Sequence, residues 1–362
     1  MFNPSRLVLA RTRRGLTKSD LAARVDLSTR ALHGHESGQF IPSPETLDLL
    51  GRALRFPVEF FSGPTIEIPI ADGVSFRSLE AMTASQRNGA LGASAIGVVL
   101  SEWIATRFEL PAPDLPILRG YEPAAAADAV RAAWGLGERP IKNMIHLLES
   151  RGVRVFSLSE EGRELDAFSF WWGGSTPYVF LNTQKSAEHG RFDAAHELGH
   201  LVLHRHGGAR TKATEHEADR FASAFLMPSG SVIAAAPRLS SVRSLIELKP
   251  KWNVSVAALN VRLHALGLTS DWKYRNLCIE ISRRGYRTSE PHGSRHESSQ
   301  VLQKVFQQLR DDGIGKADVA RELLIYTDEL DSLVFGLVMR RIEGGAAHPT
   351  PRPGSANLRR LD

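Results

Sequence analysis

Cysteine is almost absent from this chain, which has a single cysteine, Cys278, among its 362 residues. A disulfide framework and a cysteine-rich zinc module are both excluded by that scarcity. No run of 18 apolar residues occurs, so no transmembrane helix is expected, and the first residues do not lead into the apolar stretch of a secretory signal. We therefore expect a soluble cytoplasmic protein.

A large excess of charge of either sign is also missing. Lysine and arginine number 45 against 40 acidic residues, and the net charge is +5. This mild basicity permits a nucleic-acid partner without requiring one. The hydrophobic share of 42% and the charged share of 23% are ordinary for a globular protein, which excludes wholesale disorder, collagen and coiled coil. At roughly 100–200 residues per domain, the length predicts two or three domains.

Helix-start signals divide the first 61 residues into four short helices. A first basic helix is expected over residues 7–14. Thr17 followed by Asp20 has the spacing of a capping box at the second helix. Ser28 can cap a third helix, and Pro44 suits the first turn of a fourth. These segments predict a compact helical bundle.

Three segments rich in aromatic and β-branched residues predict short strands in the middle of the chain, at residues 153–158, 167–172 and 178–182. A long helix is expected from about Ala187 to His204. Further helices are expected at residues 90–108, 123–134, 140–149, 214–226, 242–247, 254–266, 274–283, 298–310, 316–323 and 327–340. The predicted fold class is α+β and predominantly helical, with one small β-sheet.

The strongest chemical signal is the run His196-Glu197-Leu198-Gly199-His200. Residues four apart share one face of a helix, so both imidazoles can bind one zinc ion while Glu197 reaches a zinc-bound water. With thirteen histidines in the chain, about 0.03 such runs are expected by chance. A buried helix needs a reason to carry these polar groups. We therefore expect one zinc ion per chain.

Two segments compete to supply the third zinc ligand. His206 lies six residues beyond His200, as in the metzincin pattern, but Leu203 stands where that pattern requires glycine. A downstream helix instead offers Glu215, with Asp219 four residues later on the same face. In that arrangement Glu215 binds zinc and Asp219 orients one of the ligand histidines.

Two further polar residues are expected near this site. Glu217 faces differently from Glu215 on the downstream helix and is the fallback ligand. His204 follows His200 by one turn and is expected on the helix surface or beside a ligand rather than on the metal.

The ligand set predicts a mechanism. Two histidines and one glutamate leave a zinc position for water, whose pKa falls towards about 7 while the metal polarises the scissile carbonyl. Glu197 takes the proton from that water and passes it to the leaving amine. As an exposed edge, the strand at 178–182 could hold an extended peptide; ordinary core is the preferred interpretation.

Residues 191–204, the Glu215–Ala218 pair and the Phe-Leu-Met-Pro run at 225–228 together resemble the ImmA/IrrE family of metallopeptidases, over roughly residues 140–270. This resemblance implies a gluzincin-like zinc site and an intracellular protease that cuts a repressor, often one encoded nearby. It also implies three ligands and one base, which are His196, His200, Glu215 and Glu197.

The first 60 residues resemble the phage-repressor-like XRE helix-turn-helix through Leu16-Thr17-Lys18, Leu21-Ala22, Leu27-Ser28, Glu36-Ser37-Gly38 and Pro44-x-x-Leu47. In that fold the start of the third helix enters the major groove of double-stranded DNA. The residues expected at DNA are Ser28, Thr29 and Arg30 at the bases and Lys18 and Arg14 at phosphates. Gly34 inside this helix and His35, at a usually apolar position, depart from the pattern. A dimerisation or repressor-docking module is the alternative.

A weak internal repeat relates the segment Gly15–Ala22 to the segment Gly313–Ala320. The same offset also pairs Thr29 with Thr327. Both segments suggest helix-turn-helix geometry. The second carries acidic residues where DNA phosphate would repel them, so we prefer a packing or sensing role, with a convergent helical hairpin as the alternative. These acidic residues are Asp328, Glu329 and Asp331.

The expected domains are a helix-turn-helix domain at 1–62, a helical connecting region at 63–135, a zinc metallopeptidase domain at 136–270, a helical C-terminal region at 271–343 and a disordered tail at 344–362. The leading hypothesis is a zinc endopeptidase that cleaves a repressor-like regulatory protein and carries a DNA-binding head that can dimerise. One alternative is a DNA-binding regulator whose peptidase fold is only a sensing or structural scaffold, and another is an antitoxin-like protein in which zinc only stabilises the fold. Glu197 favours the enzyme, because a purely structural metal site has no use for a base.

Overall fold

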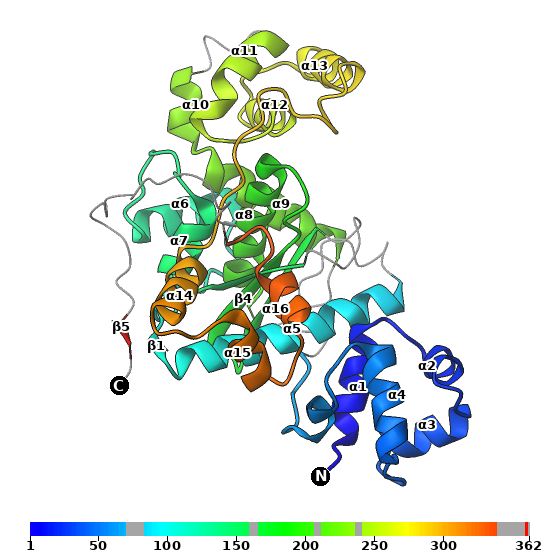
Figure 1. The fold of residues 1–362 in the computed structure, drawn as a ribbon. Helices are drawn as coiled ribbons and strands as arrows, with labels where there is room; N and C mark the ends of the chain where they lie inside the picture. Colours follow the sequence, from blue (N-terminus) through cyan, green and yellow to red (C-terminus); the bar gives the residue numbers. More distant parts are fainter. Residues whose placement is uncertain (70–82, 159–165, 206–210, 236–240, 339–358, 361–362) are drawn as a thin grey trace, which may run out of the picture.

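The computed structural model describes residues 1–69, 83–158, 166–205, 211–235, 241–338 and 359–360 (Figure 1). Its fold is α+β and predominantly helical, as the sequence predicts, with a three-stranded sheet in the middle of the chain. None of the helices within these ranges is long and apolar enough to cross a membrane.

The N-terminal head is a bundle of four helices followed by a 3-10 turn. α1, α2, α3, α4 and η1 span Pro4–Arg13, Lys18–Arg24, Thr29–Glu36, Pro44–Leu54 and Val58–Ser62. The predicted caps are present: Thr17 and Asp20 form a capping box at α2, and the Ser28 hydroxyl accepts a hydrogen bond from the Ala31 amide. The interior is filled by leucines from every helix, among them Leu7, Leu21, Leu32 and Leu50.

The chain then builds the sheet and the helices around it. α5, β1, α6, α7, β2, β3, β4, α8 and α9 span Ala84–Ala105, Phe108–Glu109, Pro123–Ala133, Met144–Ser150, Arg154–Ser157, Ala167–Trp172, Thr176–Leu181, Ala187–Leu203 and Lys212–Leu226. The helix predicted at 140–149 begins only at Met144, because the Asn143 side chain caps it by accepting a hydrogen bond from the His146 amide.

β4 is the middle strand of the sheet, whose order is β2-β4-β3. It runs parallel to β2 and antiparallel to β3, with Val179 opposite Val155 and Phe180 opposite Phe168. The idea that residues 178–182 form an exposed edge is therefore wrong, and the preferred core interpretation is confirmed, because β4 has a hydrogen-bonded neighbour on each side. The rings of Phe168 and Phe180 stack with their centroids 4.9 Å apart.

After α9 the chain forms a helical lobe and then a three-helix unit (Figure 1). α10, α11, η4, α12 and α13 of the lobe span Ser229–Ala235, Val242–Leu248, Lys249–Lys251, Val256–Ala265 and Asp271–Arg283. α14, α15 and α16 of the unit span Gln300–Asp311, Lys316–Glu322 and Thr327–Val334. The sequence reading missed α10, which follows Pro228 directly.

The predicted disordered tail lies largely outside the described residues. Only Arg359–Arg360 can be compared with that prediction, and they form the two-residue strand β5, paired antiparallel with β1. At these two positions the chain is ordered by backbone pairing, which the polar, proline-rich composition did not indicate.

Candidate metal centre and DNA-binding head

α8 carries the two histidines of the expected metal centre on the side that faces α9. The helix begins at its Ser186 cap and runs as one piece to Leu203, so the imidazoles of His196 and His200 lie one turn apart. Gly199 lets α9 approach closely. A Cβ atom added at Gly199 would lie only 3.1 Å from the Phe221 ring and 3.3 Å from the Ala218 Cα atom. This close packing brings α9, and the carboxylate it carries, up to the two histidines.

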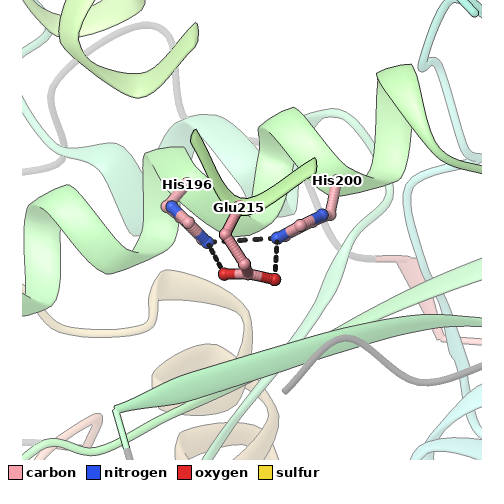
Figure 2. A group of neighbouring side chains, drawn as sticks. All are labelled: His196, His200 and Glu215. Carbon is pink, nitrogen blue, oxygen red and sulfur yellow. Dashed lines mark hydrogen bonds and ion pairs between the residues drawn. The ribbon is translucent and has the colours of Figure 1, made fainter. Parts of the chain in front are cut away.

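Three side-chain groups converge at this point (Figure 2). The Nε2 atoms of His196 and His200 are 3.1 Å apart, and each lies 3.3 Å from one carboxylate oxygen of Glu215. One possible ligand atom from each of the three residues lies within 4.8 Å of the other two. Two imidazole nitrogens and a carboxylate are a donor set that zinc prefers. The residues present therefore fit a single zinc ion.

The electrostatics of Glu215 suit a ligand that must stay ionised. Burial raises the pKa of its carboxyl group, but the hydrogen bonds from the His196 and His200 imidazoles outweigh burial and hold that pKa well below its usual range. The carboxylate is therefore negatively charged at neutral pH and ready to bind a cation.

Each ligand histidine is oriented through its other ring nitrogen. His196 Nδ1 lies 2.9 Å from an Asp219 carboxylate oxygen, as expected for a residue that orients a ligand. His200 Nδ1 lies 3.0 Å from His204 Nδ1, and His204 Nε2 lies 2.9 Å from Glu217 Oε2. These contacts aim both Nε2 atoms at the centre. Glu217, the fallback ligand, is therefore placed beside His204 instead of at the metal centre.

Glu197 is fully buried between α8 and the sheet, and its Oε2 accepts a hydrogen bond from the Ser169 hydroxyl at 2.6 Å. Ser169 lies on β3, which packs against α8. Sequence reasoning missed this serine. Its signal was the one hydroxyl of β3, which stands between the aromatic residues Phe168 and Phe170. His206, the ligand of the metzincin alternative, lies outside the described residues.

A second cluster of possible ligands lies nearer the start of α8, formed by Asp166, His189 and Asp193. His189 Nε2 is 3.3 Å from Asp193 Oδ2, and the Lys185 ammonium forms an ion pair with Asp166. An ammonium group of the chain itself pairs with one of the two carboxylates and His189 contacts the other, so these side chains form a network of polar contacts.

In the head, the residues expected to read DNA bases lie at the exposed start of α3. Ser28, Thr29 and Arg30 are all solvent-exposed there. Lys18, expected at a phosphate, instead lies 3.0 Å from His33 Nδ1 and 3.4 Å from the Glu36 carboxylate. The structure therefore groups three of the five expected residues on one accessible surface and gives Lys18 partners within the head.

Arg14, the other residue expected at a phosphate, is also engaged within the protein. Its guanidinium donates to the Glu329 carboxylate at 2.8 Å and to the Leu54 carbonyl oxygen at 2.7 Å. The expectation that Arg14 faces DNA phosphate does not match this arrangement, because its guanidinium is already bound within the protein. Nothing in the sequence indicates this, since Glu329 comes from a segment far away along the chain.

The two departures from the helix-turn-helix pattern have one shared cause, which is the ring and backbone of Phe40. A Cβ atom at Gly34 would lie 2.2 Å from the Phe40 ring, so any larger residue there would require that ring to move. The His35 ring is buried, and its Nδ1 lies 3.1 Å from the Phe40 carbonyl oxygen, which satisfies the polar group. Both residues therefore adapt α3 to the turn that follows it.

Two segments of the chain match known protein families. Residues 148–264 match the IrrE N-terminal-like domain, and residues 7–61 match the helix-turn-helix family. The chain carries an IrrE N-terminal-like domain behind a helix-turn-helix domain. This confirms the resemblance based on sequence motifs. No curated protein matches the chain.

The IrrE N-terminal-like domain belongs to a metallopeptidase family, and every residue of the candidate metal centre lies inside it. The helix-turn-helix domain includes the exposed start of α3. Residues 62–147 and 265–362 lie outside both matches. The boundaries proposed for the connecting and C-terminal regions therefore remain predictions.

Proposed function

We propose that this protein is a zinc-dependent endopeptidase of the HExxH type that cleaves a repressor-like regulatory protein. Its head, residues 1–62, binds double-stranded DNA as part of a homodimer, so that proteolysis is linked to transcriptional regulation or to a stress or mobile-element response. The observation that carries this proposal is the convergence of His196, His200 and Glu215, with the buried Glu197 directly following His196 on α8.

The proposed reaction assigns one task to each residue. His196, His200 and Glu215 would hold the zinc ion, which when bound would supply a Lewis acid for the peptide carbonyl and for the attacking water. Glu197 takes a proton from the attacking water and delivers it to the amine that leaves. A base is required for this task but not for a structural metal site, which is why its presence supports an enzyme.

Ser169 and Asp219 support this assignment as positioning residues. The Ser169 hydroxyl donates to Glu197 Oε2. This hydrogen bond fixes one carboxylate oxygen and therefore the orientation of the carboxylate relative to α8. Asp219 pairs with His196 Nδ1 and so keeps Nε2 available on the side of the centre. Both contacts preorganise the proposed base and ligand before substrate arrives.

The decisive experiment uses Glu197→Gln, which preserves shape but removes the base. This variant should keep its metal and bind the substrate without cleaving it, so a captured protein can be identified and then offered to the unaltered enzyme. We expect cleavage of the captured protein to fall by about 10²–10⁴-fold in the variant. Glu247→Gln, an exposed change on α11, is the matched control and should cleave normally.

Unchanged cleavage by Glu197→Gln would remove Glu197 as the base. Full metal binding with no cleavage of any captured regulator by the unaltered protein would instead favour the alternative, a DNA-binding regulator that uses its peptidase fold as a scaffold.

A further inference from the structure

The C-terminal unit α14–α16 repeats the backbone of the head in detail. α2 and α15 begin at Lys18 and Lys316, and α3 and α16 begin at Thr29 and Thr327, which is the same offset along the chain. The turn between the paired helices also recurs, because Asp26 and its counterpart Leu324 both adopt positive φ angles, of 52° and 58°. Neither residue is glycine, so a shared turn geometry is the simplest reason for this conformation.

Hydrogen bonds recur at the same offset. The Leu27 amide donates to the Ala22 carbonyl oxygen, and the Ile325 amide donates to the Ala320 carbonyl oxygen, both at 2.9 Å. The capping contacts match as well: the Asp20 carboxylate accepts from the Thr17 amide and the Asp318 carboxylate from the Gly315 amide, again both at 2.9 Å. Even the side-chain pair Lys18–His33 has its counterpart in the ion pair Lys316–Asp331.

The repeat reverses the charge at the start of its third helix. Where the head has Arg30 and Ala31, the C-terminal unit has Asp328 and Glu329. Phosphate would repel this surface, so the second unit cannot use the same positions to approach DNA.

These acidic residues contact the head. Glu329 accepts hydrogen bonds from Arg13 Nε at 2.5 Å and from Arg14 Nη1 at 2.8 Å, and its side chain is only 2% exposed. Asp328 forms an ion pair with Arg55 at the rim of the same contact. The first turn of α16 therefore places carboxylates against arginines of the head. The position in α3 that corresponds to Asp328 is Arg30, the residue expected to contact DNA.

The opposite side of this unit is attached to the peptidase domain. α16 packs against β2, and the Thr183 hydroxyl after β4 donates to the Phe335 carbonyl oxygen at 3.0 Å. The buried Glu149 carboxylate of α7 accepts hydrogen bonds from the Ser299 hydroxyl and the Gln300 amide at the start of α14. α14–α16 thus lie between the head and the sheet that backs the metal-centre helix.

We propose that α14–α16 form a second helix-turn-helix unit whose reading helix binds the arginines of the head in place of DNA, and thereby fixes the head to the peptidase domain. Figure 1 places α3 on the side of the head away from α16 and α5, so docking leaves the start of α3 accessible. The head and the peptidase domain then keep one relative orientation, whatever the head has bound. This inference does not depend on peptidase activity.

The test measures the distance between spin labels on the full-length protein by double electron–electron resonance. Labels are placed at Asp48→Cys on α4 and Ser150→Cys on α7, both exposed, in a Cys278→Ser background. The parent protein should give one narrow distance distribution. Glu329→Gln should broaden it, because Arg13 and Arg14 lose their shared charged partner.

Two further sets of variants make this test specific. Asp331→Asn removes a carboxylate from the same helix whose partner, Lys316, lies inside the unit, and it should leave the distribution narrow. Asp328→Arg and Arg55→Asp place like charges at the exposed rim and should each broaden the distribution, while combining them should restore it.

A narrow distribution in Glu329→Gln would overturn the proposal. If Glu329→Gln does not fold, the rim variants decide, and broadening without recovery in the Asp328→Arg, Arg55→Asp double variant would also overturn it. Equal broadening by Asp331→Asn would show a general loss of structure in the unit and count against docking through Glu329.

Discussion

The candidate metal centre and the proposed DNA-reading surface of the head differ in how far the protein itself orders their side chains. At the centre, His196 and His200 are buried and each is held by a second side chain, so the geometry exists before any metal or substrate binds. At the start of α3, Thr29 and Arg30 are exposed to solvent. The difference teaches that burial and side-chain partners fix the geometry of the candidate metal centre, whereas the start of α3 is open to solvent and accessible to a partner.

The largest expected effect tests the candidate metal centre. Replacing His196 and His200 together by alanine removes two of the three proposed ligands, so metal content should fall from about one zinc per chain to almost none. Metal analysis of the purified proteins by mass spectrometry measures it. Retention of the full metal content would show that the centre lies elsewhere.

A smaller effect is expected when a ligand is left intact but its orientation is released. Asp219→Ala removes the carboxylate that holds His196 Nδ1, and metal affinity should fall by about 10–100-fold. Competition with a chelator of known affinity measures this change. Asp271→Ala, an exposed acid on α13, is the control, and an equal loss there would make the Asp219 effect nonspecific.

On the exposed side, Arg30→Ala should weaken specific DNA binding by about 1–3 kcal/mol, because an arginine bound to a base edge is lost. Lys18→Ala should have less effect, because Lys18 is already paired with Glu36 and His33 in the head. Fluorescence anisotropy with promoter DNA at several salt concentrations distinguishes the two. If Lys18→Ala weakens binding more than Arg30→Ala, the surface at α3 is not the reading surface.

A buried carboxylate outside the metal centre, Glu149, shows burial outweighing both its hydrogen bonds and a nearby cation, Arg154. Burial raises the pKa of Glu149 to about 7, despite hydrogen bonds from the Ser299 hydroxyl and the Val301 and Gln300 amides. Because the folded pKa exceeds the unfolded value of 4.5, the folded protein binds the extra proton, and stability should fall as pH rises from 4.5 to about 7.

The expected slope is at most about 1.4 kcal/mol per pH unit for this one group, and above pH 7 its contribution should be constant. Urea unfolding across this pH range measures the slope. Glu149→Gln cannot titrate, so it should lose this component, and an unchanged slope in that variant would assign the pH dependence to other groups.

Sequence reasoning succeeded where neighbouring residues carry the information. The Thr17–Asp20 capping box, the span of α8 and the strand at 167–172 appear as predicted, because caps and side-chain periodicity are local properties. It failed where the partner comes from another segment. The Arg14–Glu329 and Ser169–Glu197 hydrogen bonds each join residues that are far apart in the sequence. No rule of residue spacing predicts such pairs.

By itself, the amino-acid sequence determined that two histidines would share a helix face with a glutamate between them, because helical periodicity depends only on adjacent residues. Only the tertiary structure decided that Glu215 would face them while Glu217 would pair with His204. That choice depends on which face α9 turns towards α8, and this face is decided by the packing of Ala218 and Phe221 against Gly199.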